Sequence, residues 1–273
     1  MNVQTDQPVK MHLKSHGTLI MGCFINADSW DDTIKRIHRW SAAHESRYIC
    51  ICNVHSVVTA RHNKAFFHAL TNADMATPDG MPISWMLQHI GFPNQRRING
   101  PDLMWNYCEF AESNNESIFL YGSTQQTLDN LQRRLRISFP KLRVAGTYSP
   151  PFRALNAEEE EFITDLINNS GANVVFVSLG CPKQELWMAT QRGKINAVMI
   201  GIGAAFDYHA GTIKRAPLWM QHRGLEWLYR LHSEPRRLWK RYAVTNSIFI
   251  IFAGWQLFTY KFKNKYKYFS QIK

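Results

Sequence analysis

The chain has 273 residues, of which 45% are hydrophobic and 19% are charged. It is therefore long enough and apolar enough to bury a core, which excludes a disordered chain and favours one large domain with or without an appendage. The formal net charge is +11 at neutral pH. A charge of this size indicates an anionic partner such as nucleic acid, lipid headgroups or a phosphorylated substrate.

The positive charge is concentrated at one end of the sequence. Residues 211–273 contain thirteen Lys and Arg against two acidic residues, whereas residues 1–210 contain nineteen of each kind. We therefore predict two regions with separate tasks, a neutral core over residues 1–210 and a basic appendage over residues 211–273.

The cysteines and the beginning of the sequence predict a cellular compartment. The five cysteines form no Cys-x-x-Cys pair and are predicted to be buried free thiols. Residues 1–17 are polar and lack the apolar segment of a signal peptide. Both features favour the reducing cytoplasm.

Short β-rich runs alternate with helical patterns along most of the chain. Strands are predicted over residues 48–52, 74–77, 117–122, 143–148, 173–180 and 196–203. Helices are predicted over residues 30–43, 100–112, 124–137, 157–169 and 183–191. This alternation is typical of βαβ crossovers, so we predict an α/β fold with a mostly parallel sheet and helices on both faces.

After residue 211 the strand pattern ends. Pro217, Gly224 and Pro235 are predicted to divide the remaining sequence into short helices. The longest apolar run, residues 247–258, is shorter than the roughly 20 residues that cross a bilayer. We therefore expect this run to lie on a membrane without spanning it.

The appendage combines cations with aromatic residues. Arg230, Arg237 and Arg241 are spaced by seven and four residues, which places them on one helix face unless Pro235 breaks the helix. Tryptophans are interleaved with these arginines, and four lysines follow between residues 261 and 267. Interfacial membrane elements have this composition. A nucleic-acid surface is the alternative, because aromatic side chains stack on bases, but the apolar run favours a membrane.

In a parallel α/β sheet, ligands bind beyond the carboxyl ends of the strands, so the motifs at these ends are candidates for a site. TPDG (77–80) places Asp79 in a tight turn, where it is a general base for a hydroxyl or an ordinary turn aspartate. SLGCPKQE (178–185) begins a helix. The amides of this helix and Gln184 are expected to hold a phosphate or sugar hydroxyls, or only to cap the helix.

Two further motifs concern phosphate and cofactor binding. RRINGPD (96–102) places Arg96 and Arg97 before a helix start, where a guanidinium pairs with a diphosphate or is solvated at the surface. GIGAAF (201–206) is close to a dinucleotide fingerprint, but Phe206 stands at the third glycine, which argues against a nicotinamide cofactor.

No cofactor or metal is predicted. The sequence contains no Asp-x-Asp triplet and no His, Cys or acidic cluster with metal-ligand spacing. If the protein catalyses a reaction in which a nucleotide diphosphate leaves, cationic side chains and not a metal ion have to stabilise the diphosphate.

In their order and spacing, these motifs resemble those of the WecG/TagA/CpsF family of bacterial glycosyltransferases. The matching segments are the asparagine of CNVHS, TPDGMP, RRINGPD, FLYGS, SLGCPKQE, GIGAAFDYHAGTIKRAPLWM and GLEWLYRLHSEPRRLWKRY, within residues 49–242. The resemblance implies a Rossmann-like catalytic core with a helical C-terminal appendage. It also implies an inverting, metal-independent transfer of a sugar from a nucleotide donor, with a UDP-sugar favoured, to a polyprenyl-diphosphate-linked saccharide in cell-surface polysaccharide biosynthesis.

The resemblance also implies roles for individual residues. Asp79 matches the general base of the family. The substrate-binding residues that it implies are Asn53, Arg97, Gln184, Gly201, Asp207, Arg230, Arg237 and Arg241. Some members carry a threonine where this chain has Ile51, so no hydroxyl role is assigned there, and the extension from Ser247 lies beyond the motifs.

The implied partners are the nucleotide-sugar donor, the lipid-linked acceptor and the anionic lipids at the inner face of the bacterial cytoplasmic membrane, where the protein is expected to be peripheral. Nucleic acid is not an expected partner. Two alternatives are a non-catalytic regulator that binds a nucleotide sugar and a basic nucleic-acid-binding protein. The donor sugar, the acceptor glycan and the formation of a homo-oligomer stay open.

Overall fold

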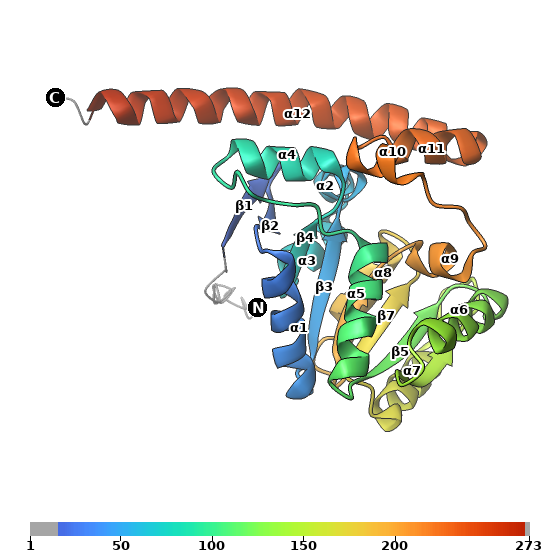
Figure 1. Cartoon of the computed structure of the whole chain (residues 1–273). Coiled ribbons are helices and arrows are strands. Elements are labelled where there is room, and N and C mark those ends of the chain that lie inside the picture. Colours follow the sequence, from blue (N-terminus) through green and yellow to red (C-terminus); the bar gives the residue numbers. More distant parts are fainter. Residues whose placement is uncertain (1–15, 271–273) are drawn as a thin grey trace, which may run out of the picture.

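The computed structural model describes residues 16–270, with side chains described up to Phe262. Its centre is a parallel six-stranded sheet in the order β4-β3-β8-β7-β5-β6 (Figure 1). The strands are β3 (Arg47–Cys52), β4 (Met75–Pro78), β5 (Ser117–Gly122), β6 (Arg143–Tyr148), β7 (Val174–Ser178) and β8 (Val198–Gly201). Each predicted strand is present to within two residues, so the parallel sheet is confirmed.

Helices cover both faces of this sheet, as predicted. One face packs against α1 (Trp30–Ala42), α5 (Gly100–Ser113), α6 (Gln125–Ser138) and α9 (Ala205–Ala210). The other packs against α2 (Val54–His62), α3 (Lys64–Thr71), α7 (Ala157–Ser170) and α8 (Lys183–Gln191). Successive side chains of a strand point to opposite faces, so Cys50 belongs to one apolar cluster and Ile49 and Ile51 to the other. The fold is therefore a Rossmann-like α/β sheet.

Five elements within residues 17–89 were not predicted, namely α2, α3, a pair of strands and the helix after β4. β1 (Gly17–Ile20) and β2 (Cys23–Asn26) form an antiparallel hairpin, and α4 (Met81–His89) follows β4. The hairpin is attached to the sheet through Asn26, whose side-chain oxygen accepts a hydrogen bond of 2.8 Å from the amide of Ala76. Each hairpin strand has four residues and little periodic signal, and unlike β4 and β8 neither belongs to the alternation of strands and helices along the chain.

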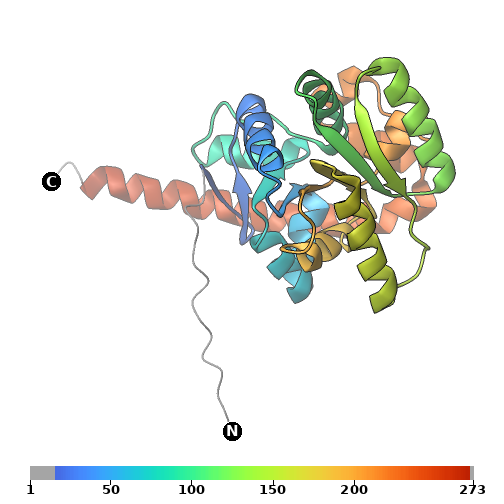
Figure 2. The same ribbon diagram turned by 90° about the horizontal axis from the view of Figure 1, so that it is seen from below.

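The appendage contains α10 (Leu218–His222), α11 (Glu226–Ser233) and α12 (Pro235–Ser270). The prediction of short helices throughout is wrong, because Pro235 stands at the start of α12, where proline is tolerated, and does not interrupt it. α12 lies along α2 and α4, and its C-terminal part projects past the hairpin (Figure 1, Figure 2).

The apolar run is part of a much longer helix, so its own length no longer decides whether this segment could cross a bilayer. Residues 247–258 lie inside α12, and the stretch Pro235–Phe262 is long and apolar enough to span a membrane by length and composition alone. Only 17% of its apolar window is buried in the protein. Most of the surface of this helix is therefore not covered by the rest of the protein.

Specific contacts hold α12 against the body. Phe249 and Ala253 are buried in the same apolar cluster as α2 and α3. The side chain of Gln256 accepts a hydrogen bond from the amide of Met21 and donates one to the carbonyl of Leu19, at 2.9 and 2.6 Å. The appendage thus packs on the core, and the proposed division at residue 210 stays a prediction.

The prediction for the cysteines is confirmed. All five are free; four are buried and Cys181 is half-buried. Residues 1–15, which include most of the segment that lacks a signal-peptide pattern, lie outside the described residues. The side chains of Lys263, Lys265 and Lys267 lie outside them as well.

Candidate active site

The ends of β3 and β4 bring Asn53 and Asp79 together. Asn53 follows β3 and caps α2, accepting a hydrogen bond of 3.2 Å from the amide of Ser56. The amide of Asp79 donates to the carbonyl of Cys52 at 2.8 Å, which fixes Asp79 beside the end of β3. Gly80 then turns the chain into α4 with a φ of 79°, a conformation that glycine adopts without strain.

Asp79 is a half-buried carboxylate in a mixed electrostatic environment. Burial raises its pKa above the ordinary aspartate value, and Glu226 raises it further. Arg97 opposes this most strongly, and hydrogen bonds from the Asn53 side chain and the Gly80 amide also lower the pKa. A carboxylate with a raised pKa is a better proton acceptor than a solvated aspartate, which suits a general base.

Arg97 lies beside Asp79 and reaches the appendage. The amide of Ile98 donates to the carbonyl of Pro78 at 2.8 Å, so the segment that carries Arg97 runs along the end of β4. The Arg97 guanidinium donates to the carboxylate of Glu226 on α11 at 3.0 Å, with both side chains less than 20% exposed. The arginine predicted to bind a diphosphate is therefore paired with a carboxylate in this structure.

Arg215 and Glu226 were not among the predicted site residues. Arg215 donates to the carboxylate of Asp102 and, at 3.2 Å, to the side chain of Asn99, at the start of α5. It also forms an ion pair of 3.5 Å with Glu226. Glu226 is one of two acidic residues in the basic region, and that isolation was the available signal in the sequence.

Arg230 and Arg241 are half-buried arginines of the appendage. In each, the Nε atom is buried and has no hydrogen-bond partner among the described residues. Arg230 lies 5.9 Å from the ring centre of Tyr208 on α9, and its charge lowers the pKa of Arg241. A buried cation with an unpaired donor is costly, so this pair of guanidiniums is suited to an anionic ligand.

Arg237 differs from the other two appendage arginines. Its side chain is 58% exposed and forms an ion pair of 2.5 Å with Glu234. Since α11 ends at Ser233 and α12 begins at Pro235, the three predicted arginines do not share one continuous helix. The structure places Arg230 and Arg241 near each other and leaves Arg237 at the surface.

His55 was also missed as a site residue. It lies in the first turn of α2, and burial together with the positive charge of Arg241 lowers its pKa to about 4. The ring is therefore neutral at pH 7. The influence of Arg241 on His55 also shows that the start of α12 lies over the same strand ends as Asn53.

Gln184 braces the turn after β8. It is 3% exposed, and its side-chain oxygen accepts a hydrogen bond of 3.1 Å from the amide of Gly203. Gly201 faces the Gln184 carboxamide so closely that a Cβ there would lie 3.0 Å from Nε2. In this structure both residues make packing contacts within the protein, and their predicted contacts with substrate stay predictions.

Asp207 lies on the same side as Arg230. It is half-buried in α9, and the hydroxyl of Thr212 donates to its carboxylate at 3.3 Å. Burial raises the pKa of Asp207, whereas hydrogen bonds from Thr212 and Thr127 and the charge of Arg230 lower it. The predicted contact of Asp207 with substrate stays a prediction.

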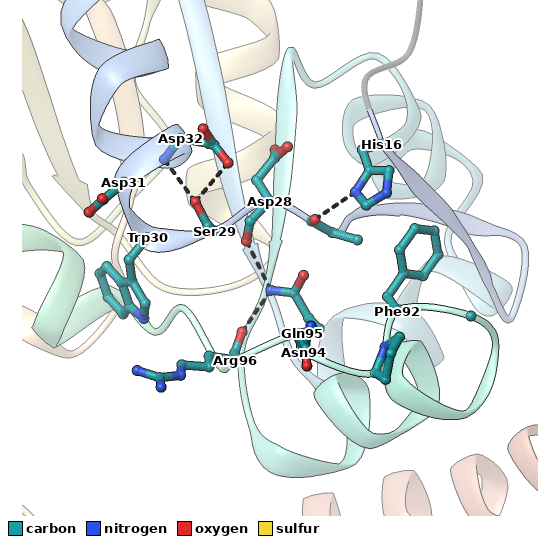
Figure 3. Close-up of a pocket in the computed structure, with 13 residues that line it drawn as sticks. His16, Asp28, Ser29, Trp30, Asp31, Asp32, Phe92, Asn94, Gln95 and Arg96 are labelled. Atoms are coloured by element: carbon teal, nitrogen blue, oxygen red, sulfur yellow. Dashed lines mark hydrogen bonds between the residues drawn. The ribbon is translucent and has the colours of Figure 1, made fainter.

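A cavity of about 510 Å³ opens on another side of the Arg97 segment (Figure 3). It lies between the beginning of α1 and residues 91–96, with Trp30 and Arg96 on one side and His16 and Phe92 on the other. None of the predicted site residues lines it. The neighbouring arginines therefore point to different places, Arg97 to the appendage and Arg96 to this cavity.

Metal binding finds no support in the described part of the chain. Between residues 16 and 262, no group of three His, Cys, Asp or Glu side chains is arranged to hold a metal ion. Metal independence itself stays a prediction.

Comparisons with known proteins place this site in a family. The sequence model described as the glycosyl transferase WecG/TagA/CpsF family matches residues 18–263. An N-acetylglucosaminyldiphosphoundecaprenol N-acetyl-beta-D-mannosaminyltransferase of Bacillus spizizenii is 32% identical over 71% of this chain and 74% of its own length. A protein of the same description from Bacillus subtilis is 31% identical over 71% of this chain and 73% of its own length. The chain is a glycosyltransferase and belongs to the WecG/TagA/CpsF family.

Proposed function

We propose that this enzyme transfers a sugar from a nucleotide donor, with a UDP-sugar favoured, to a saccharide linked to polyprenyl diphosphate. The names of the two Bacillus relatives describe transfer of an N-acetylmannosaminyl group to such an acceptor. The observation that carries the proposal is the position of Asp79 beside Arg97, next to the appendage that supplies Arg230 and Arg241. A carboxylate that suits a general base and guanidiniums that suit a diphosphate thus lie in one region, which supports the proposal.

The proposed reaction is a single displacement. Asp79 accepts the proton of the acceptor hydroxyl as the oxygen attacks the anomeric carbon of the donor. The new bond from carbon to oxygen forms while the bond from carbon to phosphate oxygen breaks, and its electron pair leaves with the nucleotide diphosphate. Attack from the face opposite the leaving group inverts the anomeric configuration.

Arginines replace a divalent metal in this proposal. Arg230 and Arg241 stabilise diphosphate charge, because their buried donors have no partner among the described residues. Arg97 joins them when the substrate competes with Glu226 for its guanidinium. The transfer is therefore proposed to be metal-independent.

We further propose that the enzyme is peripheral at the inner face of the cytoplasmic membrane. Large exposed apolar side chains are concentrated on the appendage, and the most exposed members of α12 are Val244, Ile250, Ile251, Trp255 and Phe258, at 55–70%. Exposed cations such as Arg236 and Lys240 accompany them. Anionic lipids attract the cations while the apolar face enters the interface.

The attachment of α12 favours a helix that lies on the membrane. Its buried residues pack against α2, and Tyr260 donates a hydrogen bond of 2.8 Å to the carbonyl of Ile90 at the end of α4. A helix fixed along the body over this distance is not free to cross a bilayer. We therefore prefer the membrane-associated transferase to the two alternatives, a non-catalytic regulator and a nucleic-acid-binding protein.

A screen of nucleotide sugars tests the proposed donor class. A nucleotide sugar that binds the folded enzyme raises its melting temperature. We expect a UDP-sugar to give the largest rise and then to support transfer to a diphosphate-linked N-acetylglucosamine lipid, with release of UDP. A purine nucleotide sugar that stabilised the enzyme and supported transfer would overturn the donor assignment.

A further inference from the structure

Glu185 is a buried carboxylate that touches Gln184 and is not explained by the proposed mechanism. It lies in the first turn of α8 and is 1% exposed. Its Oε1 atom accepts a hydrogen bond of 2.9 Å from the Nε2 atom of Gln184. Its Oε2 atom is buried and has no hydrogen-bond partner among the described residues. A buried carboxylate oxygen without a hydrogen-bond donor lowers the stability of the folded protein. Such a group calls for an explanation, and we look for it in the function.

The contacts of Gln184 form a chain that ends at the site. Glu185 accepts from Nε2 of Gln184, and Oε1 of Gln184 accepts from the amide of Gly203. Gly203 lies in the turn between β8 and α9, and α9 carries Asp207. The position of this turn therefore depends on which way the carboxamide of Gln184 faces.

The carboxylate determines that orientation by its chemistry. An ionised carboxylate only accepts hydrogen bonds, and a backbone N–H only donates them. If the Gln184 carboxamide flipped, its oxygen would face the carboxylate and its NH₂ group would face the Gly203 amide, so both hydrogen bonds would be lost. Glu185 thus permits only the orientation that holds the turn.

We propose that Glu185 is a positioning residue that locks the carboxamide of Gln184 and thereby holds the β8–α9 turn and Asp207 in place for the donor nucleotide. This inference rests on the proposed function for the role of Asp207, but its structural part is independent of it. Burial raises the pKa of Glu185 to about 7, against the hydrogen bond from Gln184. Measurements at about pH 8 therefore keep it mostly ionised.

The test compares two substitutions of Glu185 by hydrogen–deuterium exchange of the full-length enzyme. Glu185→Met fills the space without an acceptor, whereas Glu185→Gln keeps an acceptor oxygen. We expect the amide of Gly203 to exchange about tenfold faster in Glu185→Met and to stay near the wild-type rate in Glu185→Gln. The matched control is Gln191→Met, since Gln191 lies on the same helix, is 1% exposed and bonds Thr164 at 2.9 Å. It should leave Gly203 unchanged.

The second readout is binding of UDP. Glu185→Met should weaken UDP binding about tenfold, with no further loss when it is combined with Gln184→Ala, because both act through one contact. Unchanged exchange at Gly203 in Glu185→Met, additive effects in the double variant, or equal losses in both Glu185 variants would overturn the inference. If the wild type does not bind UDP, the donor proposal fails, and the exchange experiment still decides the role of Glu185.

Discussion

At the scale of single residues, the proposed chemistry depends on how the surroundings of Asp79 set its basicity. Burial and Glu226 raise its pKa, and Arg97 with the hydrogen bonds from Asn53 and Gly80 lowers it. The same arginine is paired with Glu226, so a charge on α11 influences the base in two ways. A diphosphate that displaced Glu226 from Arg97 would change the contributions of both side chains to the pKa of Asp79.

The direct test of the base is Asp79→Asn. The amide cannot accept the proton of the acceptor hydroxyl, so we expect kcat to fall about 100-fold or more while donor binding is retained. Transfer kinetics and calorimetric binding measure the two effects. Asp165→Asn, at an exposed position on α7, is the surface control and should behave as the wild type. Near-normal turnover in Asp79→Asn would remove Asp79 from the mechanism.

The pH dependence of kcat/KM gives a second test at this scale. The base acts when ionised, so activity is lost as the pH falls through the pKa of Asp79, and this acid limb should lie above the ordinary aspartate value. Glu226→Gln removes a negative charge that raises this pKa, so the limb should move to lower pH. Arg97→Ala should move it to higher pH. A limb that stays fixed in both variants would contradict the assignment.

The sequence identified the residues whose positions follow from local structure. Asn53 and Asp79 come directly after strands, and the carboxyl ends of parallel strands meet at one edge. The partner of Arg97 was not predictable, because Glu226 lies 129 residues away and meets it only through the packing of the appendage. For the same reason, the sequence predicted a diphosphate contact for Arg97 and not the ion pair.

At the scale of elements, we propose that α11 and α12 supply the site with two half-buried arginines, Arg230 and Arg241. The helical conformation is interrupted at Glu234, between the two helices. Arg230 and Arg241 are nevertheless close enough for the charge of Arg230 to lower the pKa of Arg241, in addition to the effect of burial. Their burial beside Tyr208 and Tyr242 strengthens any hydrogen bond to an anion. In the proposed mechanism, the two helices complete the site that begins at the strand ends.

Replacing Arg230 or Arg241 by alanine tests this role. Each variant should lower kcat/KM about 10- to 100-fold, because a charge-assisted contact with diphosphate is lost. Its melting temperature should not fall, because an incompletely paired buried cation is removed. Arg236→Ala, at an exposed position on α12, is the control for loss of positive charge. Parallel losses of stability and activity would indicate a structural role instead.

The elements of the core were easier to predict than those of the appendage. The strands and their helices carry strong apolar periodicity, and the boundaries of α8 match the prediction. In the appendage, Pro235 was interpreted as an interruption, although proline is favoured at a helix start. The length of α12 depends on its packing against α2 and α4, which the sequence of the helix alone does not reveal.

At the scale of the whole molecule, the appendage lies along one end of the body and presents its open side away from the sheet (Figure 1). The exposed residues of α12 project from this side, whereas Phe249 and Ala253 face the core. A membrane that contacted the open side would meet the acceptor lipid close to Arg241. Under the proposed function, membrane contact thus brings the acceptor to the proposed site.

Sedimentation with anionic vesicles tests this contact. Serine at Ile250, Ile251 and Trp255 together should reduce vesicle binding at least about tenfold, because the apolar area that enters the interface is lost. Ile137→Ser, at a position 75% exposed on α6, is the control for removal of surface apolar area and should bind as the wild type. Unchanged binding of the triple variant would place the membrane contact elsewhere.

The most direct measurement of the central claim is transfer on a membrane. The wild-type enzyme is incubated with labelled UDP-N-acetylmannosamine and with N-acetylglucosaminyl-diphosphoundecaprenol in anionic vesicles, and the linkage of the product is determined by NMR. We predict one labelled disaccharide on the lipid for each UDP released, with a β linkage formed from an α-linked donor and with full activity in a metal chelator. Retention of the α configuration, or UDP release without sugar on the lipid, would contradict the account.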